Sequence, residues 1–422
     1  MARLKEYSGH YCESEYEYAF IGFLEVEGWK YSSGNNISRV TKRDVLIADD
    51  FKKFIADTNP DLTEDEVTQI YDNVRLVGAE SDFATLHKVY GWMVNGVQFT
   101  PQDELPRMIP LIDFDNWDKN IFRVVNQFTV DYTSNGQKEN RRPDVLLFVN
   151  GMPLCVIELK NPADANATIY DAWEQINIRY WRDIPHLLHY CPLSCISDGV
   201  KTRLGTVRTP YEHFYAWRRV NEGDAVSTLP FAETKTMIKG VYTPERFVEI
   251  FRDYIYFQDS IYDSDEVEIV CRYPQFFAAK LLKQSIVNSV VTRSGKGGTY
   301  FGATGCGKTY TMAFLARQLA LRCTDISEIG SPTIILIVDR DELQKQGSKL
   351  FTKSKEFLNL GEVSVVKNRT QLRQELGARQ SGGFYICTIQ KFCDREYDKI
   401  GLINDRQNII CFSDEAHRTQ LE

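Results

Sequence analysis

The octapeptide GATGCGKT at residues 302–309 is the feature that most constrains this chain, because it fits the pattern G-x-x-x-x-G-K-[ST]. It follows the apolar stretch GGTYF and opens TYTMAFLARQLAL, which has the composition of a helix. Glycines in such a loop let backbone N–H groups approach phosphate oxygens, and the helix N-terminus adds positive potential. The pattern therefore predicts a strand, a phosphate-binding loop and a helix in succession.

The loop and a later acidic tetrapeptide together predict a site for ATP and magnesium. Lys308 would reach the β- and γ-phosphates, and Thr309 would hold magnesium. Asp414, directly after the apolar strand IICFS, would bind the magnesium ion directly or through water, and Glu415 would polarise the attacking water; His417 completes the tetrapeptide. The remaining expected nucleotide contacts are Gly302, Thr304, Gly305, Cys306 and Gly307.

The fold class of the second half follows from its alternation of segments. Buried-looking strands (GGTYFGA, TIILIVD, GFYICTI, NIICFSDE) alternate with helical segments, as in a parallel sheet with crossover helices. The first half reads as a separate, compact α/β domain. We expect an α/β protein with domains at 1–230 and 271–422, joined by a connector at 231–270.

Composition narrows the functional class only mildly. A length of 422 residues suggests two or three domains, and a net charge of −8 argues against a protein that merely coats nucleic acid. The N-terminus lacks the apolar core of a signal peptide, and no run of about 18 apolar residues predicts a membrane span. The ten cysteines are scattered, so we expect free thiols in the cytoplasm rather than a zinc site.

The first half offers clear local signals. Residues 13–27 have a helical pattern with Ala19, Phe20, Phe23 and Leu24 as the apolar face, and Gly28 ends it. A helical, polar region follows to about residue 90. Asn95-Gly96 is a hairpin signal, residues 121–132 read as one strand, and residues 134–142 read as a loop. Residues 167–181 read as a helix, and LSCISDG reads as a strand that ends in a turn.

Two apolar strands, 144–149 and 153–159, carry charges only near their ends. They are joined at Asn150-Gly151, a favoured pair for a tight hairpin, with Asp144 at the entrance and Glu158 and Lys160 at the exit. Glu158 and Lys160 project to the same face because a strand has a period of two. Two acids can hold Mg²⁺, with the carbonyl of Leu159 as a further ligand, and the lysine can orient or deprotonate an attacking water. The alternative is a hairpin with solvated ends.

Asp144, then thirteen residues, then Glu158-Leu159-Lys160 resembles the PD-(D/E)xK nuclease core. The flanking LIDFDNWDKNIFRVVNQFTV and RRPDVLLFVNGMPLCVIELKNP are similar to the N-terminal nuclease of the R (restriction) subunit of type I restriction-modification enzymes. The resemblance implies that a glutamate on the first helix faces the site, which is Glu17 here or, second in order, Glu15.

The same resemblance implies a Gln-x-x-x-Tyr element on the helix after the lysine. Gln175 is present, but Arg179 stands four residues later and the tyrosine is Tyr180. Because residues i and i+4 share a helix face, either Arg179 or a locally distorted Tyr180 fills the place. Lys138, Arg141 and Arg142, in the expected loop, would contact DNA phosphates; a solvated basic loop is the alternative.

Further motifs resemble those of superfamily 2 helicases and translocases, and of the R subunit among them. IVDRDELQKQ and CTIQKF are similar to motifs that face the DNA backbone, which would assign Arg340, Thr388 and Gln390 to nucleic acid. RYPQFFAAKLL is similar to the adenine-recognising segment, with Gln275 as the base reader.

The resemblance implies a type I site-specific deoxyribonuclease whose full complex couples magnesium-dependent DNA cleavage to ATP-driven translocation of double-stranded DNA. Its implied partners are double-stranded DNA and the methylation (M) and specificity (S) subunits. The chain stops five residues after His417, without a second motor domain, so we expect at best weak ATP binding and no useful turnover. A repair or recombination helicase with a fused nuclease, and an inactive truncated product that only binds DNA, remain alternatives.

Overall fold

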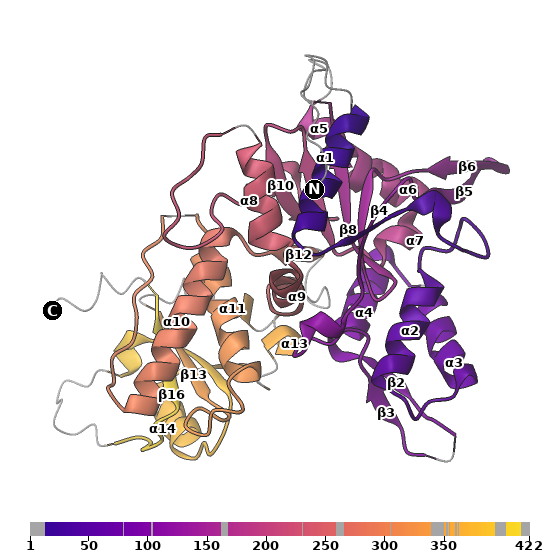
Figure 1. Cartoon of the computed structure of the whole chain (residues 1–422). Helices are drawn as coiled ribbons and strands as arrows, with labels where there is room; N and C mark the ends of the chain where they lie inside the picture. Colours follow the sequence, from indigo (N-terminus) through magenta and orange to yellow (C-terminus); the bar gives the residue numbers. More distant parts are fainter. Residues whose placement is uncertain are drawn as a thin grey trace. The chain divides into compact units, whose positions relative to one another are not determined.

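The computed structural model divides the chain into two compact units, shown in Figure 1. Unit 1 comprises Met1–Ile255 with Glu268–Arg272, and unit 2 comprises Tyr256–Val267 with Tyr273–Glu422. The structure describes residues 13–78, 80–102, 104–161, 168–229, 231–258, 266–303, 305–338, 350–351, 353, 355–358, 361, 363–392 and 402–414.

Unit 1 is built on a mixed six-stranded sheet in the order β1-β4-β7-β8-β9-β10. The β1–β4 and β8–β9 pairs are parallel, and the other neighbours are antiparallel. Every residue of β7 and β8 is buried, so these apolar runs form the centre of the sheet, as expected. The strands are β1 (Lys30–Ser33), β4 (Phe122–Asn126), β7 (Val145–Val149), β8 (Met152–Leu159), β9 (Leu193–Ser197) and β10 (Thr202–Thr206).

In sequence order, four α-helices precede the central β7–β8 hairpin and five follow it in the described part of unit 1. The expected first helix is confirmed, although its most buried face is Tyr16, Glu17, Phe20, Ile21 and Leu24. The helices are α1 (Glu13–Val26), α2 (Ala48–Thr58), α3 (Glu64–Arg75), α4 (Asp82–Asn95), α5 (Ile169–Glu174), α6 (Trp181–Asp183), α7 (Pro185–Leu188), α8 (Ala232–Val241) and α9 (Pro244–Asp253).

The tight turn between β7 and β8 is confirmed, and it is buried. Asn150 and Gly151 both have positive φ, at 50° and 76°, as a two-residue hairpin turn of this kind requires. The Asn150 side chain accepts a hydrogen bond from the Ile121 N–H at 2.8 Å and donates to the Leu111 carbonyl at 2.9 Å. The Ile47 N–H donates to the Gly151 carbonyl at 2.8 Å, so α2 begins directly against the turn.

Three local predictions for unit 1 are wrong. Residues 121–132 are two strands, because Gln127 has a φ of 55° and breaks the run between β4 and β5 (Val130–Ser134). Residues 134–142 are no loop: Asn135-Gly136 is a tight turn into β6 (Gln137–Arg141), which pairs with β5. Asn95-Gly96 ends α4, and the antiparallel pair that follows is formed by β2 (Val97–Phe99) and β3 (Arg107–Ile109), so this dipeptide is not its turn.

Unit 2 contains a parallel four-stranded sheet in the order β14-β15-β13-β16. Three of its strands are the expected TIILIVD, GFYICTI and NIICFSDE segments, so the parallel α/β prediction is confirmed for them. The strands are β13 (Thr333–Val338), β14 (Val363–Val365), β15 (Phe384–Thr388) and β16 (Ile409–Ser413), and the helices are α10 (Tyr273–Thr292), α11 (Lys308–Leu321), α13 (Lys355–Leu358) and α14 (Arg369–Gly377). The chain passes from one unit to the other within β11 (Ile255–Gln258), within β12 (Val267–Val270) and again between Arg272 and Tyr273.

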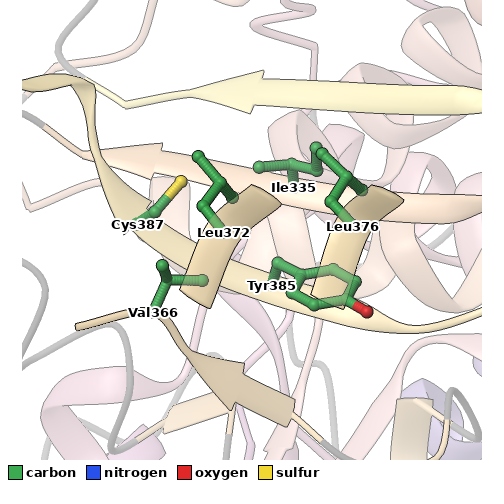
Figure 2. Packing of buried hydrophobic residues seen from close by; sticks show 6 residues of the cluster. All are labelled: Ile335, Val366, Leu372, Leu376, Tyr385 and Cys387. Atoms are coloured by element: carbon green, nitrogen blue, oxygen red, sulfur yellow. The ribbon is translucent and has the colours of Figure 1, made fainter. Parts of the chain in front are cut away.

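The core of unit 2 shows why its crossover helix lies on the sheet. Leu372 and Leu376, one turn apart on α14, pack against Ile335 of β13 and against Tyr385 and Cys387 of β15 (Figure 2). Val366, directly after β14, completes this buried cluster. The helix thus buries its apolar stripe against the parallel strands β13 and β15.

The predicted strand before the phosphate-binding loop is not formed. Residues 297–303 have no regular structure, and Phe301 is 96% exposed. Gly297 and Gly298 weaken any strand there, and β16 is the edge of the sheet as far as the described residues go.

Two sequence expectations concern cysteines and membranes. The eight cysteines within the described ranges are free thiols, as expected for them. No helix in the described part of the chain has the length and apolarity needed to cross a membrane.

Candidate functional site

The central hairpin of unit 1 brings Asp144 and Glu158 together. Val145 pairs with Ile157 in the β7–β8 ladder, which sets Asp144 opposite Glu158. The Leu159 N–H donates to Asp144 Oδ2 at 2.7 Å, and the Asp144 N–H lies 3.4 Å from Glu158 Oε1. The apolar strands therefore deliver two carboxyl groups to the same end of the sheet, as the spacing predicts.

Glu158 is completely buried, with 0% of its surface exposed. Its Oε1 accepts a hydrogen bond from the Tyr180 hydroxyl at 2.5 Å, whereas its Oε2 has no hydrogen-bond partner. Lys160 Nζ lies 3.9 Å from Oε2. Burial, reinforced by the neighbouring Asp144 carboxyl, raises the pKa of Glu158 well above its usual range, and burial also raises the pKa of Asp144.

Three successive hydrogen bonds connect Lys160 to Glu158 through Gln175 and Tyr180. Lys160 Nζ donates to Gln175 Oε1 at 3.1 Å, and Gln175 Nε2 donates to the Tyr180 hydroxyl at 2.8 Å. The Tyr180 hydroxyl in turn donates to Glu158. Gln175 and Tyr180 thus fix both the lysine and the buried carboxyl.

The helix that carries these two residues is π-helical from Gln175 to Tyr180. In an α-helix a residue at i+5 would lie away from Gln175, but a π-helix repeats at i+5 and places Tyr180 over it. Arg179 is exposed and pairs with Glu174 at 2.9 Å. Of the two residues left open by the sequence, Tyr180 is therefore the one that contacts Gln175 and Glu158.

The third predicted acid, Glu17, lies on the buried side of α1. Its Oε1 accepts a hydrogen bond from Asn126 Nδ2 at 2.6 Å, at the end of β4. Burial raises the pKa of Glu17, and the nearby charge of Asp144 raises it further. Asn126 was missed from the sequence, although it is a polar residue directly after Val124 and Val125.

The oxygen atoms of Asp144 and Glu158 suit a divalent cation that takes few ligands from the protein. A buried carboxylate oxygen without a hydrogen-bond partner, Glu158 Oε2, is the kind of group that a cation satisfies. No group of three or more His, Cys, Asp or Glu side chains in the described residues is arranged to hold a metal ion. A cation here would therefore rely on Asp144, Glu158, main-chain oxygen and water, as Mg²⁺ commonly does.

The two predicted DNA-contacting arginines differ in their surroundings. The Arg141 guanidinium forms an ion pair with the buried Asp183 carboxylate, at 2.6 Å. Arg142, the next residue, is exposed. Arg141 therefore holds β6 to α6, and Arg142 is the one presented to solvent.

In unit 2 the phosphate-binding loop has the backbone that its glycines allow. Gly305 and Gly307 have φ values of 80° and 84°, and α11 begins at Lys308, followed by the half-buried Thr309. A Cβ at Gly302 would come within 2.6 Å of Cys306 Sγ. Gln275 is 4% exposed, and its Nε2 donates to the carbonyls of Gly307 at 3.1 Å and Cys306 at 3.3 Å.

Three further predicted residues of unit 2, Thr388, Gln390 and Asp414, lie at or just after the carboxyl ends of strands. Asp414 follows β16, and its N–H donates to the Ile337 carbonyl at 2.9 Å. Thr388 ends β15 with 4% exposure, whereas Gln390 is exposed. The buried Thr388 is thus not presented to a nucleic acid in this conformation. Thr304, Arg340, Glu415 and His417 lie outside the described residues.

Deletion of Ile178 is expected to leave the free energy of unfolding of unit 1 nearly unchanged. Ile178 is half exposed, and its removal puts Gln175 and Tyr180 at i and i+4 of a plain α-helix, again on one face. Insertion of one alanine after Ile178 should instead leave the buried Tyr180 hydroxyl without its partners and cost about 1 to 3 kcal/mol. Chemical denaturation measures both variants, and equal losses would contradict the role assigned to the π-helix.

Each half of the chain matches a model of a known protein family. Residues 11–213 match the family model described as type I restriction enzyme R protein N terminus, and residues 274–422 match SWI2/SNF2 ATPase. The chain is 30% identical, over 97% of its length and 39% of the relative's, to the type I restriction enzyme HindI endonuclease subunit of Haemophilus influenzae. It is 30% identical, over 96% of its length and 39% of the relative's, to the putative type I restriction enzyme MjaIXP endonuclease subunit of Methanocaldococcus jannaschii. The chain thus spans about two fifths of these curated relatives.

Proposed function

The chain belongs to the type I restriction enzyme R protein family, and on that premise we propose that unit 1 is a magnesium-dependent DNA endonuclease with a PD-(D/E)xK core. Unit 2 is proposed to be the first RecA-like domain of an ATP-driven DNA motor. Its match to SWI2/SNF2 ATPase and its parallel sheet support this assignment.

One observation carries the nuclease proposal, which is the buried Glu158 carboxyl held between Asp144, Lys160 and Tyr180. Magnesium, when bound, supplies charge neutralisation and an activated water for phosphodiester hydrolysis. Asp144 and Glu158 Oε2 would hold it, together with the carbonyl of Leu159. Lys160 Nζ, fixed by Gln175 Oε1, keeps a positive charge where the attacking water and the phosphate must meet.

The surrounding residues have positioning roles in this scheme. Tyr180 fixes Glu158 Oε1, which leaves Oε2 as the oxygen directed to the cation. Glu17, held by Asn126, adds a third carboxyl group near Asp144. Arg142, which is exposed two residues before Asp144, would contact a DNA phosphate, while Arg141 contributes by holding its strand in place.

In unit 2 the proposed nucleotide site comprises the phosphate loop and Gln275. Lys308 would contact the β- and γ-phosphates, Thr309 and Asp414 would hold magnesium, and Glu415 would polarise water. Gln275, which now donates to two loop carbonyls, would read the adenine base. Gln390 and Arg340 would face the DNA backbone.

The relatives' names extend the proposal to a larger assembly. They are called endonuclease subunits of type I restriction enzymes, which favours a restriction role over a repair helicase–nuclease or an inactive DNA-binding product. We propose that the chain acts with methylation and specificity subunits on double-stranded DNA. Nicking of supercoiled DNA by the wild-type chain with Mg²⁺, and its absence in Asp144→Ala or with chelator, tests the central claim.

Magnesium is expected to raise the thermal stability of unit 1 more at pH 8 than at pH 6. Burial raises the pKa values of Asp144 and Glu158, so protons compete with the cation until both carboxyls are ionised. At saturating Mg²⁺, about 100 times its Kd, the gain in stability is about 2.7 kcal/mol. Thermal melts with and without Mg²⁺ measure this, and an equal shift at both pH values would contradict it.

Glu158→Gln is the control variant for the pH dependence of stability in the absence of Mg²⁺, measured by the same thermal melts. Since the pKa of Glu158 is higher in the folded than in the unfolded state, the folded state binds more protons between the two values. The contribution of Glu158 to stability is therefore present below its unfolded pKa and is lost as the pH rises through its folded pKa. Glu158→Gln should remove this loss and also the stabilisation by Mg²⁺.

A further inference from the structure

Strands β5 and β6 form a two-stranded ribbon that no other strand of the described residues joins. It runs outward from the six-stranded sheet of unit 1 (Figure 1). The ladder from Val130–Arg141 to Ser134–Gln137 is closed by Asn135 and Gly136, whose φ values are 48° and 77°. This turn matches the natural twist of paired strands, so the ribbon is a regular, well-defined arm.

One face of the ribbon is committed to the body of unit 1. Alternate pairs share a face, and this face carries Val130 with Arg141, and Tyr132 with Glu139. Val130 is fully buried, and Arg141 is paired with Asp183 of α6. The Arg141 guanidinium also lies 5.6 Å from the Tyr132 ring centre, and the Tyr132 hydroxyl donates to Glu139 at 2.6 Å.

The opposite face is polar and open to solvent. It carries Thr133 opposite Lys138 and Asp131 opposite Asn140, and of these Thr133, Lys138 and Asn140 are exposed. Asp131, the acid on this face, lies at the base of the ribbon, where its charge acts on Arg39. No apolar side chain lies on this face, so a protein partner that buries apolar surface is a poor match for it.

The ribbon is also rigidly connected to the candidate nuclease site. β6 ends at Arg141, and only Arg142 and Pro143 separate it from Asp144. Five paired residues per strand span about 16 Å, which exceeds the depth of about 8.5 Å of the major groove of DNA. The major groove admits a two-stranded ribbon, and hydroxyl, amide and ammonium groups are its usual contacts.

We propose that the β5–β6 ribbon is an arm that enters the major groove of duplex DNA beside the cut, through Thr133, Lys138 and Asn140. This inference rests on the proposed nuclease function and adds how its substrate is held. Lys138 would contact a phosphate, which gives affinity without sequence preference. The Arg141–Asp183 pair transmits the position of the arm to Asp144.

The first test is the salt dependence of duplex binding by the full chain without divalent metal. Lys138→Ala should reduce the slope of log K against log salt concentration by about 0.9, the value for one lost phosphate contact on duplex DNA. Lys138→Arg should keep the wild-type slope. Gln137→Ala, the neighbouring change on the opposite face, is the matched control and should also keep it. An unchanged slope in Lys138→Ala overturns the inference.

The second test shortens the arm without changing its faces. Deletion of residues 133, 134, 137 and 138 removes two residues from each strand and retains the Asn135-Gly136 turn, so side-chain alternation is preserved. The shortened chain should melt normally, bind duplex DNA more weakly and cut at altered positions or more slowly. Wild-type affinity and cut positions would refute the arm. If the wild type and Asp144→Ala are equally inactive on DNA, the nuclease proposal fails instead, and the binding slopes still decide the arm.

Discussion

Lys160→Ala is expected to lower the rate of magnesium-dependent DNA cleavage by about 10²- to 10⁴-fold, the range typical of a lost acid–base group. Lys160 Nζ lies 3.9 Å from Glu158 Oε2 and donates a hydrogen bond to Gln175 Oε1. These two contacts hold the lysine side chain beside the proposed metal position. Its removal takes away the charge that faces the attacking water. Initial rates of nicking of supercoiled DNA measure the effect.

The control for this prediction must separate chemistry from folding. Lys239→Ala changes an exposed lysine of α8 and should retain the wild-type rate. Stabilisation of Lys160→Ala by Mg²⁺ should persist, because Asp144 and Glu158 remain to hold the ion. A Lys160→Ala protein that melts normally, responds to Mg²⁺ and cuts at the wild-type rate would contradict the role of Lys160.

Gly151→Ala is expected to destabilise unit 1 by about 2 to 5 kcal/mol. The φ of 76° costs an alanine about 1 to 2 kcal/mol, and crowding in a packed core adds about 1 to 3 kcal/mol. The added Cβ would come within 2.2 Å of the Ile47 carbonyl oxygen and 2.8 Å of the Phe51 nitrogen, both backbone atoms that cannot rotate away. Denaturant unfolding of unit 1 measures the loss.

The chain contains its own control for the glycine prediction. Gly136 occupies the same place in the Asn135-Gly136 turn, with a φ of 77°, but nothing lies within 4 Å of a Cβ built there. Gly136→Ala should therefore cost only the conformational part, about 1 to 2 kcal/mol. Equal losses in the two variants would mean that the contact between Gly151 and the start of α2 contributes nothing.

The three Asn-Gly dipeptides show how far the sequence could predict this fold. Those at 135–136 and 150–151 are hairpin turns, whereas Asn95-Gly96 ends a helix. The dipeptide favours positive φ in every case, but it does not reveal whether a strand or a helix precedes it. Only the 150–151 turn lies between two long apolar runs, and it is the one whose structure the sequence predicted correctly.

The candidate site was predictable to the extent that it depends on strand periodicity. Asp144 and Glu158 meet because a tight turn sets the register of two buried strands, and both follow from residue spacing. The partners that come from elsewhere, Asn126 for Glu17 and Asp183 for Arg141, were missed. Such contacts join segments that are distant in sequence, so no local sequence pattern predicts them.

The strand predicted before the phosphate loop failed for a related reason. A strand is stable only when its backbone groups find a neighbour, and residues 298–301 have none among the described strands. Apolar composition alone was therefore insufficient there. In contrast, α11 and the left-handed glycines of the loop depend on local chemistry and were predictable.

The π-helical turn at Gln175–Tyr180 has a consequence for how relatives of this chain are recognised. One additional residue is absorbed as a local widening, and the chain continues directly into α6. A motif search with a fixed gap of three residues between glutamine and tyrosine would classify this chain as lacking the element. Searches should therefore allow three or four intervening residues, and an apparent loss of the motif should be checked for a one-residue insertion before the enzyme is declared degenerate.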